Sequence, residues 1–317
     1  MPLFETEKIS IPSTLLKDKY GWPPFSILNT ISWDWQRRKD EWEVIIGDST
    51  EGRDVKRNNA TPVNTFSARG ESAKTPESVS EFDPYLCELM YDWFSLPKMK
   101  ILDPFAGGCV RGVVAAVKGR NYLGIDLSPM QVVYNTNQYH RIAEKYQNIQ
   151  GKVQWECADS YELDKYELFN EKFDMVFTCP PYYNLEKYSK NPNDLSNAPT
   201  YEIFLEKYSK ILKNSAELLN EDCFFVIVVS EVRKSSWNIE ESEYIGLVPD
   251  TIKILQGIGL KYYNEIILEN NIGSLPIRAP KYFDRTRKIG RHHQNILVFY
   301  KGNLSHLEEK FGKVVKE

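Results

Sequence analysis

The stretch Ile101-Leu-Asp-Pro-Phe-Ala-Gly-Gly-Cys109 decides the fold, because an apolar strand end runs into a turn of small residues that a helix follows. Such a turn lets the backbone approach a ligand at the carboxyl edge of a parallel sheet, where doubly wound folds bind ligands. Two later strands close on Asp126 and lead to Asp159. An acid at the end of the second strand binds ribose hydroxyls in nucleotide-type sites. The pattern predicts a ligand crevice that these aspartates line.

Around this stretch, short apolar runs alternate with helical patterns, which is typical of a parallel sheet covered by helices. We therefore expect an α/β, Rossmann-like fold with helices on both faces. A further helix is expected from Phe82 until before Pro97. The predicted strands are 100–102, 122–125, 153–157, 173–178, 223–230, 261–268 and 295–300, and the predicted helices are 111–118, 129–145, 201–220 and 249–257.

The N-terminal residues 1–80 differ from the rest and are expected to form an extension that packs on or beside a central domain at 81–302. Within it, Ser32 to Trp42 predicts a helix with three tryptophans, and packing of that helix on the domain is favoured over base stacking. The polar residues 48–80 predict a long loop or linker. Residues 303–317 are expected to form a C-terminal tail.

Composition narrows the class of protein. The content of 42% hydrophobic and 26% charged residues is ordinary for a soluble protein, and the net charge of -4 means that any nucleic-acid contact must rely on local basic segments. The N-terminus lacks the features of a signal peptide, and no apolar run is long enough to span a bilayer. We expect a cytoplasmic protein with no membrane partner. Neither a disulfide framework nor a zinc site is expected from the five scattered cysteines, Cys87, Cys109, Cys157, Cys179 and Cys223.

The most specific feature is Phe173-Asp-Met-Val-Phe-Thr-Cys-Pro-Pro-Tyr182, in which an apolar strand ends at two prolines and an aromatic residue. Consecutive prolines cannot continue a strand ladder and stiffen the turn, which fixes the carbonyls that project from it. Rigid acceptors suit methylation of a base amine, whose delocalised lone pair makes it a poor nucleophile. A dinucleotide site is the competing prediction, but Ala106 to Arg111 does not supply G-x-G-x-x-G.

Both motifs resemble those of a known family. Asp103 to Cys109 is similar to the D-P-F-x-G-x-G motif of S-adenosylmethionine-dependent methyltransferases, and Cys179-Pro-Pro-Tyr182 resembles the [D/N/S]-P-P-[Y/F/W] motif of DNA amino-methyltransferases. The segments 21–30, 78–84, 229–233 and 273–278 also resemble phage and prophage DNA methylases. The resemblance implies a seven-stranded methyltransferase sheet with an antiparallel terminal hairpin, and S-adenosylmethionine as cofactor. The implied cofactor contacts are Phe82, Asp83, Asp103, Phe105, Ala106, Gly107, Gly108, Asp126, Leu127 and Asp159.

The resemblance assigns catalysis to Cys179, Pro180, Pro181 and Tyr182. In the family the first side chain and the next carbonyl accept from the target amine, and the aromatic ring stacks on a base swung out of the duplex. Cys179 departs from the pattern, since a thiol is a weak acceptor, so either the Pro180 carbonyl does most of the orienting or the catalytic detail differs. A covalent cysteine that attacks a pyrimidine carbon ranks lower, because that chemistry resembles a Pro-Cys order in its motif.

Two segments are expected to contact the target, at 184–200 and 269–294. The second shows no convincing periodicity and is expected to be a functional loop whose basic residues contact phosphates. The candidate contacts are Tyr183, Lys187, Tyr188, Arg278, Lys281, Arg285, Arg287, Lys288 and Arg291.

The function expected is site-specific methylation of adenine or cytosine amino groups in double-stranded DNA, without a metal, as in restriction-modification. The alternatives are the same fold acting on RNA or a protein amide, and a non-catalytic DNA-binding partner of another enzyme.

Overall fold

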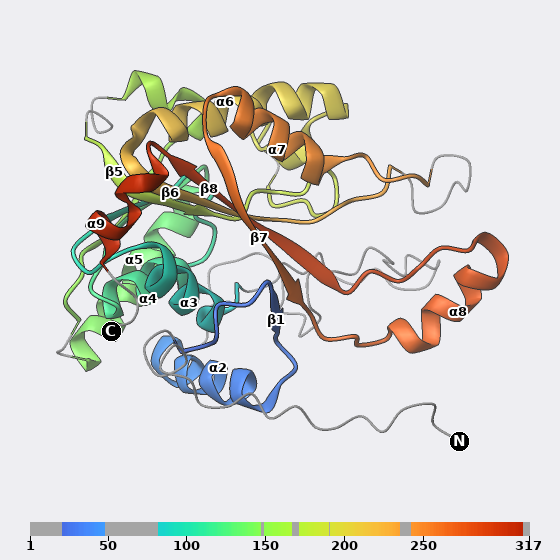
Figure 1. Ribbon diagram of the computed structural model, residues 1–317, viewed down its shortest axis with the longest axis horizontal. Coiled ribbons are helices and arrows are strands. Elements are labelled where there is room, and N and C mark those ends of the chain that lie inside the picture. Colours follow the sequence, from blue (N-terminus) through green and yellow to red (C-terminus); the bar gives the residue numbers. More distant parts are fainter. Residues whose placement is uncertain are drawn as a thin grey trace.

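The computed structural model describes residues 21–47, 82–146, 149–166, 171–189, 191–234 and 242–312. Its centre is an eight-stranded sheet with the order β1-β7-β8-β6-β5-β2-β3-β4 (Figure 1). Every neighbouring pair is parallel except the two that involve β8, which runs antiparallel to β6 and to β7. The predicted α/β class and antiparallel terminal hairpin are confirmed. The strands are β1 (Ile27–Asn29), β2 (Lys100–Asp103), β3 (Asn121–Asp126), β4 (Val153–Cys157), β5 (Phe173–Thr178), β6 (Leu219–Val229), β7 (Lys261–Glu269) and β8 (His293–Lys301).

Helices cover both faces of the sheet (Figure 1). Successive side chains of a strand point to opposite faces, so the central strand β6, which helices cover on both faces, is apolar without interruption from Cys223 to Val229. Phe224 packs in one core cluster and its neighbour Phe225 in the other. On the first face lie α2 (Trp33–Ile46), α3 (Pro84–Phe94), α4 (Val110–Val117) and α5 (Pro129–Lys145), and on the second lie α6 (Tyr201–Leu218) and α7 (Leu247–Gly257).

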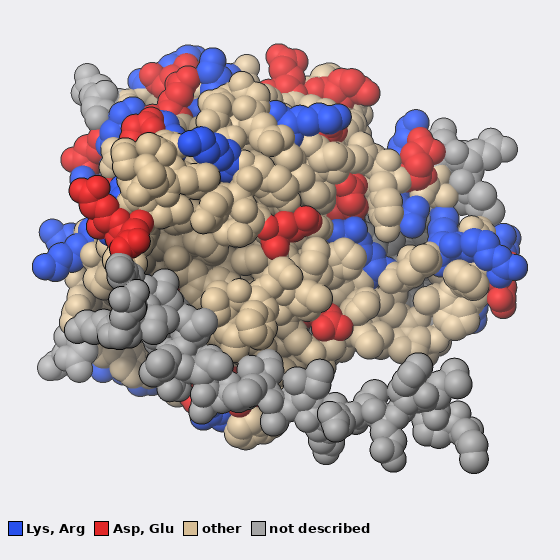
Figure 2. Space-filling view, viewed as in Figure 1, with Lys and Arg blue, Asp and Glu red and all other residues tan. Residues whose placement is uncertain are grey.

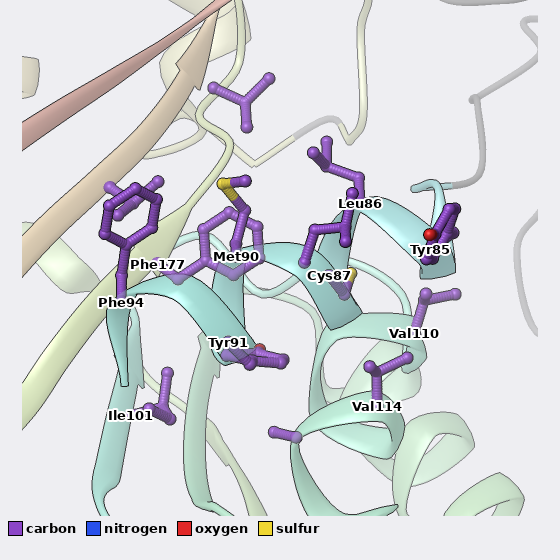
Figure 3. Packing of buried hydrophobic residues seen from close by; sticks show 14 of the residues in the cluster. Tyr85, Leu86, Cys87, Met90, Tyr91, Phe94, Ile101, Val110, Val114 and Phe177 are labelled. Atoms are coloured by element: carbon purple, nitrogen blue, oxygen red, sulfur yellow. The ribbon is translucent and has the colours of Figure 1, made fainter. Parts of the chain in front are cut away.

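Helix α3 is the buried helix that the sequence predicted from Phe82. It begins at Pro84, because the carboxylate of Asp83 accepts from the next free backbone amides and proline fits the first helical position. Its side chains pack beside Phe177 of β5, while Val110 and Val114 come from α4 (Figure 3). The helix ends at Phe94, with Ser95 as its C-cap, before Pro97 as expected.

The sheet has one strand more than the seven expected. The additional strand, β1, pairs in parallel with residues Ile267–Glu269 at the end of β7. It is three residues long with only its middle residue, Leu28, buried, so it offers too short an alternating pattern to predict.

The three tryptophans of α2 divide between core and solvent. Trp35 and Trp42 are buried against α3, as predicted for a packing helix, whereas Trp33 is 74% exposed. Residues 21–47 thus pack on the central domain through both β1 and α2. The linker predicted at 48–80 lies outside the described residues.

The segment 269–294 is not the irregular loop that the sequence predicted. It contains α8 (Leu275–Thr286), which projects beyond the rest of the sheet at the outer end of β7 and β8 (Figure 1). Two prolines obscured the helix: Pro276 stands in its first turn, where an amide is not required, and Pro280 lies inside it and removes one donor. The remaining elements of the described residues are η1 (Ser160–Lys165), η3 (Leu195–Asn197), η4 (Leu304–His306) and α9 (Leu307–Phe311).

Candidate active site

The carboxyl ends of the parallel strands bring the two sequence motifs to one edge of the sheet. Asp103 ends β2, and Thr178 ends β5, its direct neighbour in the sheet. Asp126 ends β3 on the other side of β2. The glycine turn, Asp126 and the Pro-Pro turn therefore lie at the same edge of the sheet, and a ligand crevice between them stays a prediction.

The glycine turn is held in place by hydrogen bonds from neighbouring elements. The amide of Ala106 donates to the carbonyl of Ile125 over 3.0 Å, and Asn135 Nδ2 donates to the carbonyl of Gly107 over 2.8 Å. Gly107 has φ +53°, in the left-handed region, and a Cβ at this position meets no atom within 4 Å. Gly107 thus gives the turn its shape and leaves open space beside its backbone.

Arg111 lies under this turn and was not among the predicted site residues. Its side chain is buried, its Nε lies 2.5 Å from Asp103 Oδ2, and its Nη2 donates to the carbonyls of Phe105 and Ala106 over 2.6 and 2.9 Å. Burial disfavours the charge, but the attraction of the Asp103 carboxylate, together with smaller contributions from Tyr122 and Cys179, more than offsets this and raises the pKa of Arg111. A lone arginine at the start of the apolar helix VRGVVAAV was the available signal.

Asp103 is fully buried and joins three strands. Besides Arg111, its carboxylate accepts from Thr178 Oγ1 over 2.7 Å, from the hydroxyl of Tyr122 over 2.8 Å and from the amide of Phe105 over 3.2 Å. These donors come from β5, β3 and the glycine turn. Asp103 therefore ties the glycine turn to β3 and β5, and a direct contact with the cofactor stays a prediction.

The other two predicted acids lie half-buried at the same edge. Asp126 accepts from the amide of Ser128 over 2.8 Å and, with its second oxygen, from the amide of Gly107 over 3.1 Å. Asp159 accepts from the amide of Tyr161 over 2.9 Å and begins η1. Each carboxylate oxygen carries more than one lone pair, so one amide donor does not exhaust it. Gly108 and Leu127 are likewise half-buried.

Phe82 and Asp83 reach the site from the start of α3. The guanidinium of Arg111 lies 4.5 Å from the ring centre of Phe82, which places that ring beside the glycine turn. Asp83 is committed elsewhere: it caps α3, and its Oδ2 accepts from Trp35 Nε1 over 3.0 Å. The structure thus brings Phe82 beside the glycine turn and gives Asp83 a capping role.

The turn after β5 directs its first tyrosine inward. Tyr182 is 7% exposed, and its hydroxyl accepts from Gln294 Nε2 over 2.9 Å and lies 3.3 Å from Cys179 Sγ. The next residue, Tyr183, has φ +54° and packs edge-on against Tyr201 with ring centres 5.5 Å apart. In this structure Tyr182 anchors the turn, and Tyr183 is the half-exposed ring beside it. Stacking of either on a base stays a prediction.

The thiol of Cys179 is not activated. Burial raises its pKa above the usual value, and the opposing effect of Arg111 is smaller. Because only the thiolate is a strong nucleophile, a neutral thiol does not suit covalent attack on a base.

The predicted target-contacting residues fall into groups with different surroundings. Lys187 and Tyr188 are exposed just after the Pro-Pro turn, as are Lys281, Arg285 and Arg287 on and beside α8. Figure 2 shows Lys and Arg side chains gathered over the end of the segment that carries α8. Arg291 is instead held to β8, because its Nε donates to the carbonyl of His293 over 3.1 Å. Lys288 is half-buried, and burial lowers its pKa. The side chain of Arg278 is not among those described.

The described residues form neither a metal centre nor a membrane-spanning helix. Those ranges hold no group of three or more His, Cys, Asp or Glu side chains that could bind a metal ion. Of the helices described, none is both long and apolar enough to cross a membrane.

Comparison with known proteins finds similar structures but no similar sequence. No family model matches the chain, and neither does any curated protein. One similar structure is the magnesium protoporphyrin IX methyltransferase ChlM of Synechocystis PCC 6803 with bound SAH, with 13% identity, a TM-score of 0.45, and 83% of this chain and 93% of that chain covered. Another is TrmN of Thermus thermophilus, with 13% identity and a TM-score of 0.42, covering 69% of this chain and about half, 49%, of TrmN.

A third is the N-methyltransferase NodS of Bradyrhizobium japonicum WM9 in complex with S-adenosyl-L-homocysteine. It is 11% identical with a TM-score of 0.38, and the match covers 66% of this chain and 80% of NodS. At these identities the matches say nothing about what this chain binds. Its ligand and substrate must be argued from its own residues.

Proposed function

We propose that this chain is an S-adenosylmethionine-dependent methyltransferase that modifies the exocyclic amino group of adenine or cytosine in DNA. One observation carries the proposal: the carboxylate of Asp103 binds both Arg111 under the glycine turn and Thr178 next to Cys179. The glycine turn, which suits the methyl donor, and the Pro-Pro turn, which suits the amine that accepts the methyl group, are thus both fixed to the buried carboxylate of Asp103. Methyl transfer needs this, because donor and acceptor must stand in line.

The glycine turn and the neighbouring acids fit the proposed cofactor. The open space at Gly107 admits a ligand close to the backbone. Asp126, at the end of β3, would accept from the ribose hydroxyls, and Asp159, at the end of β4, from the adenine amino group. When bound, S-adenosylmethionine supplies a methyl group activated by a positively charged sulfur.

The Pro-Pro turn would orient the target amine. The bound donor would supply the methyl group and keep the carbon–sulfur electron pair on its sulfur, while the amine nitrogen would form the new bond to carbon and release one proton to solvent. The carbonyl of Pro180 is the rigid acceptor that holds the amino group and stabilises the positive charge that develops on it. Since the Cys179 thiol is a weak acceptor, this carbonyl carries most of the orienting.

DNA is favoured as the substrate by the basic residues of α8. Lys281, Arg285 and Arg287 are exposed on or beside α8, which follows β7. Because β6 and β7 are both antiparallel to β8, β7 runs in the same direction as β6 and β1. Its carboxyl end, from which α8 leaves the sheet, therefore lies at the same edge as the Pro-Pro turn. Such residues neutralise phosphates, whereas a protein amide would not require them. DNA modification, as in restriction-modification or in phages, is the setting in which this activity belongs. The same chemistry on RNA is the second candidate.

Transfer of labelled methyl groups tests the proposal. Purified protein is incubated with methyl-labelled S-adenosylmethionine and total DNA, RNA and protein, after which each fraction is digested and counted. We expect label in DNA, and no label with Tyr182→Ala, because that change removes the anchor of the turn. Label in RNA or protein alone would show that the substrate is not DNA. Absence of S-adenosylmethionine binding in calorimetry would contradict the proposal that the chain is a methyltransferase.

A further inference from the structure

Two buried polar atoms near the Pro-Pro turn have no hydrogen-bond partner among the residues that the structure describes. They are Ser230 Oγ, directly after β6, and Asn270 Nδ2, directly after β7. Ser230 is 2% exposed and Asn270 is 4% exposed, so bulk solvent does not reach them. An unpaired buried polar group costs about 1–3 kcal/mol, and native proteins keep few of them. Both require an explanation.

The two residues lie on one face of the sheet, beside Gln294. Val228 of β6, Leu268 of β7 and Ile296 of β8 all belong to the core cluster on the α3 face. Because side chains alternate, the residues two positions on, Ser230 and Asn270, and the residue two positions before Ile296, Gln294, share that face. The pairing of Val229 with Asn295 places Ser230 opposite Gln294.

Gln294 connects this polar set to the catalytic turn. It is 6% exposed, pairs with Leu268 in the ladder, and donates to the hydroxyl of Tyr182 over 2.9 Å. The backbone amide of Asn270 in turn donates to the backbone carbonyl of His292, two residues before Gln294, over 2.7 Å. The unpaired atoms therefore lie within a few strand positions of Tyr182. They also lie at the base of the α8 arm, the segment 269–294 that carries α8 between β7 and β8.

We propose that Ser230, Asn270 and Gln294 form the polar wall of the pocket that receives the target base, with Ser230 Oγ and Asn270 Nδ2 as the groups that hydrogen-bond to it. This inference rests on the proposed function. Asn270 Nδ2 is a donor only, so it requires an acceptor, and a serine hydroxyl serves as either. Adenine and cytosine both carry ring acceptors beside the amino group. A base held by α8 through its phosphates would enter next to these atoms.

The proposal makes an unusual prediction about stability. If the two atoms form hydrogen bonds only with a bound ligand, removing them does not lower the free energy of unfolding of the free protein, because the apolar replacement no longer buries an unpaired group. Ser230→Ala and Asn270→Leu should therefore leave the denaturant midpoint unchanged or raise it. The same variants should lower kcat/KM for a duplex oligonucleotide by about tenfold each, since a pocket built to hydrogen-bond its substrate loses discrimination without those bonds. The affinity for S-adenosylmethionine should not change.

Ser95→Ala is the matched control. Ser95 is a buried serine at the opposite, amino-terminal edge of the sheet, and its hydroxyl is fully engaged: it donates to the carbonyl of Tyr91 over 2.7 Å and accepts from Arg120 Nε over 3.2 Å. Its loss should lower the midpoint and leave kcat/KM unchanged.

The outcomes separate this inference from the proposed function. An active wild-type enzyme whose kcat/KM is unaffected by Ser230→Ala and Asn270→Leu would overturn the pocket and leave the function intact. A drop in stability as large as that of Ser95→Ala would also overturn it, because it would show that the atoms bind a structural water or another partner. A wild-type protein that transfers no methyl group to DNA would overturn the proposed function, and the pocket with it.

Discussion

Arg111 and Asp103 form a buried ion pair, with Nε 2.5 Å from Oδ2, directly beneath the glycine turn. Breaking such a pair leaves an uncompensated buried charge, which costs about 3–5 kcal/mol. Arg111→Met should therefore lower the free energy of unfolding by about that amount in a denaturant titration, and weaken cofactor binding because the turn loses two donors.

The matched control is Lys100→Met, which breaks the exposed pair of Lys100 with Glu171. Exposed pairs contribute about 1 kcal/mol or less. Equal losses for the two variants would show that Arg111 has no special role under the turn.

The N-terminal helix α2 is held to α3 by tryptophan donors. Trp42 Nε1 donates to Glu88 Oε2 over 2.7 Å, and Arg38 donates to both oxygens of the same carboxylate. Trp42→Phe keeps most of the ring but removes the donor, so the free energy of unfolding should fall by about 1–3 kcal/mol. Trp33→Phe, at the exposed end of the helix, should change it by less than about 0.5 kcal/mol. Similar effects would mean that α2 is not anchored through its indoles.

Cys179 should be dispensable as a nucleophile. Because burial raises the pKa of its thiol, the sulfur stays protonated at neutral pH and serves at most as a weak acceptor. We expect Cys179→Ser to retain methyl transfer within about tenfold, as serine offers a better acceptor in the same place. Complete loss of turnover with intact folding and cofactor binding would support the covalent mechanism instead.

The exposed basic residues of the α8 arm should control the salt dependence of DNA binding. The triple variant Lys281→Ala, Arg285→Ala, Arg287→Ala removes three candidate phosphate contacts. Each lost contact should reduce the slope of log K against log salt concentration by about 0.9. Fluorescence anisotropy with a duplex measures this, and Lys253→Ala on α7, where the lysine is also exposed, should leave the slope unchanged. An unaltered slope in the triple variant would place the DNA elsewhere.

His293 should make the protein less stable in mild acid. Burial first, and then Arg291 and His292, lower its pKa below 6.5, so the folded state binds fewer protons than the unfolded state near that pH. The stabilising effect is present above pH 6.5 and is lost as the pH falls through the lowered pKa. His293→Asn should flatten the decline of the denaturant midpoint in this range, and an unchanged decline would assign it to other groups.

Local patterns predicted much of this fold, and contacts between distant residues account for most of what they missed. Strands β4 and β5 and helix α5 match their predicted bounds, because each has a clear period and sharp ends such as Pro129 and Pro180. β1 was missed because its pairing with β7 joins residues some 240 positions apart. The role of Arg111 and the unpaired atoms of Ser230 and Asn270 depend on neighbours across the sheet, which periodicity does not reveal.

The site was predicted in position more than in detail. The glycine turn, Asp126 and the Pro-Pro turn meet at one edge, as the order of motifs indicated. The inward direction of Tyr182 was not foreseen, because it depends on Gln294, more than a hundred residues later in the chain. Arg291 was grouped with free basic residues, although it is bound to β8.

The most direct test of the account is mass spectrometry of nucleosides from DNA that the purified protein has methylated with deuterated S-adenosylmethionine. We predict the deuterated methyl group on N6 of deoxyadenosine or N4 of deoxycytidine. A label on carbon 5 of cytosine, or no labelled nucleoside in DNA, would contradict the assignment.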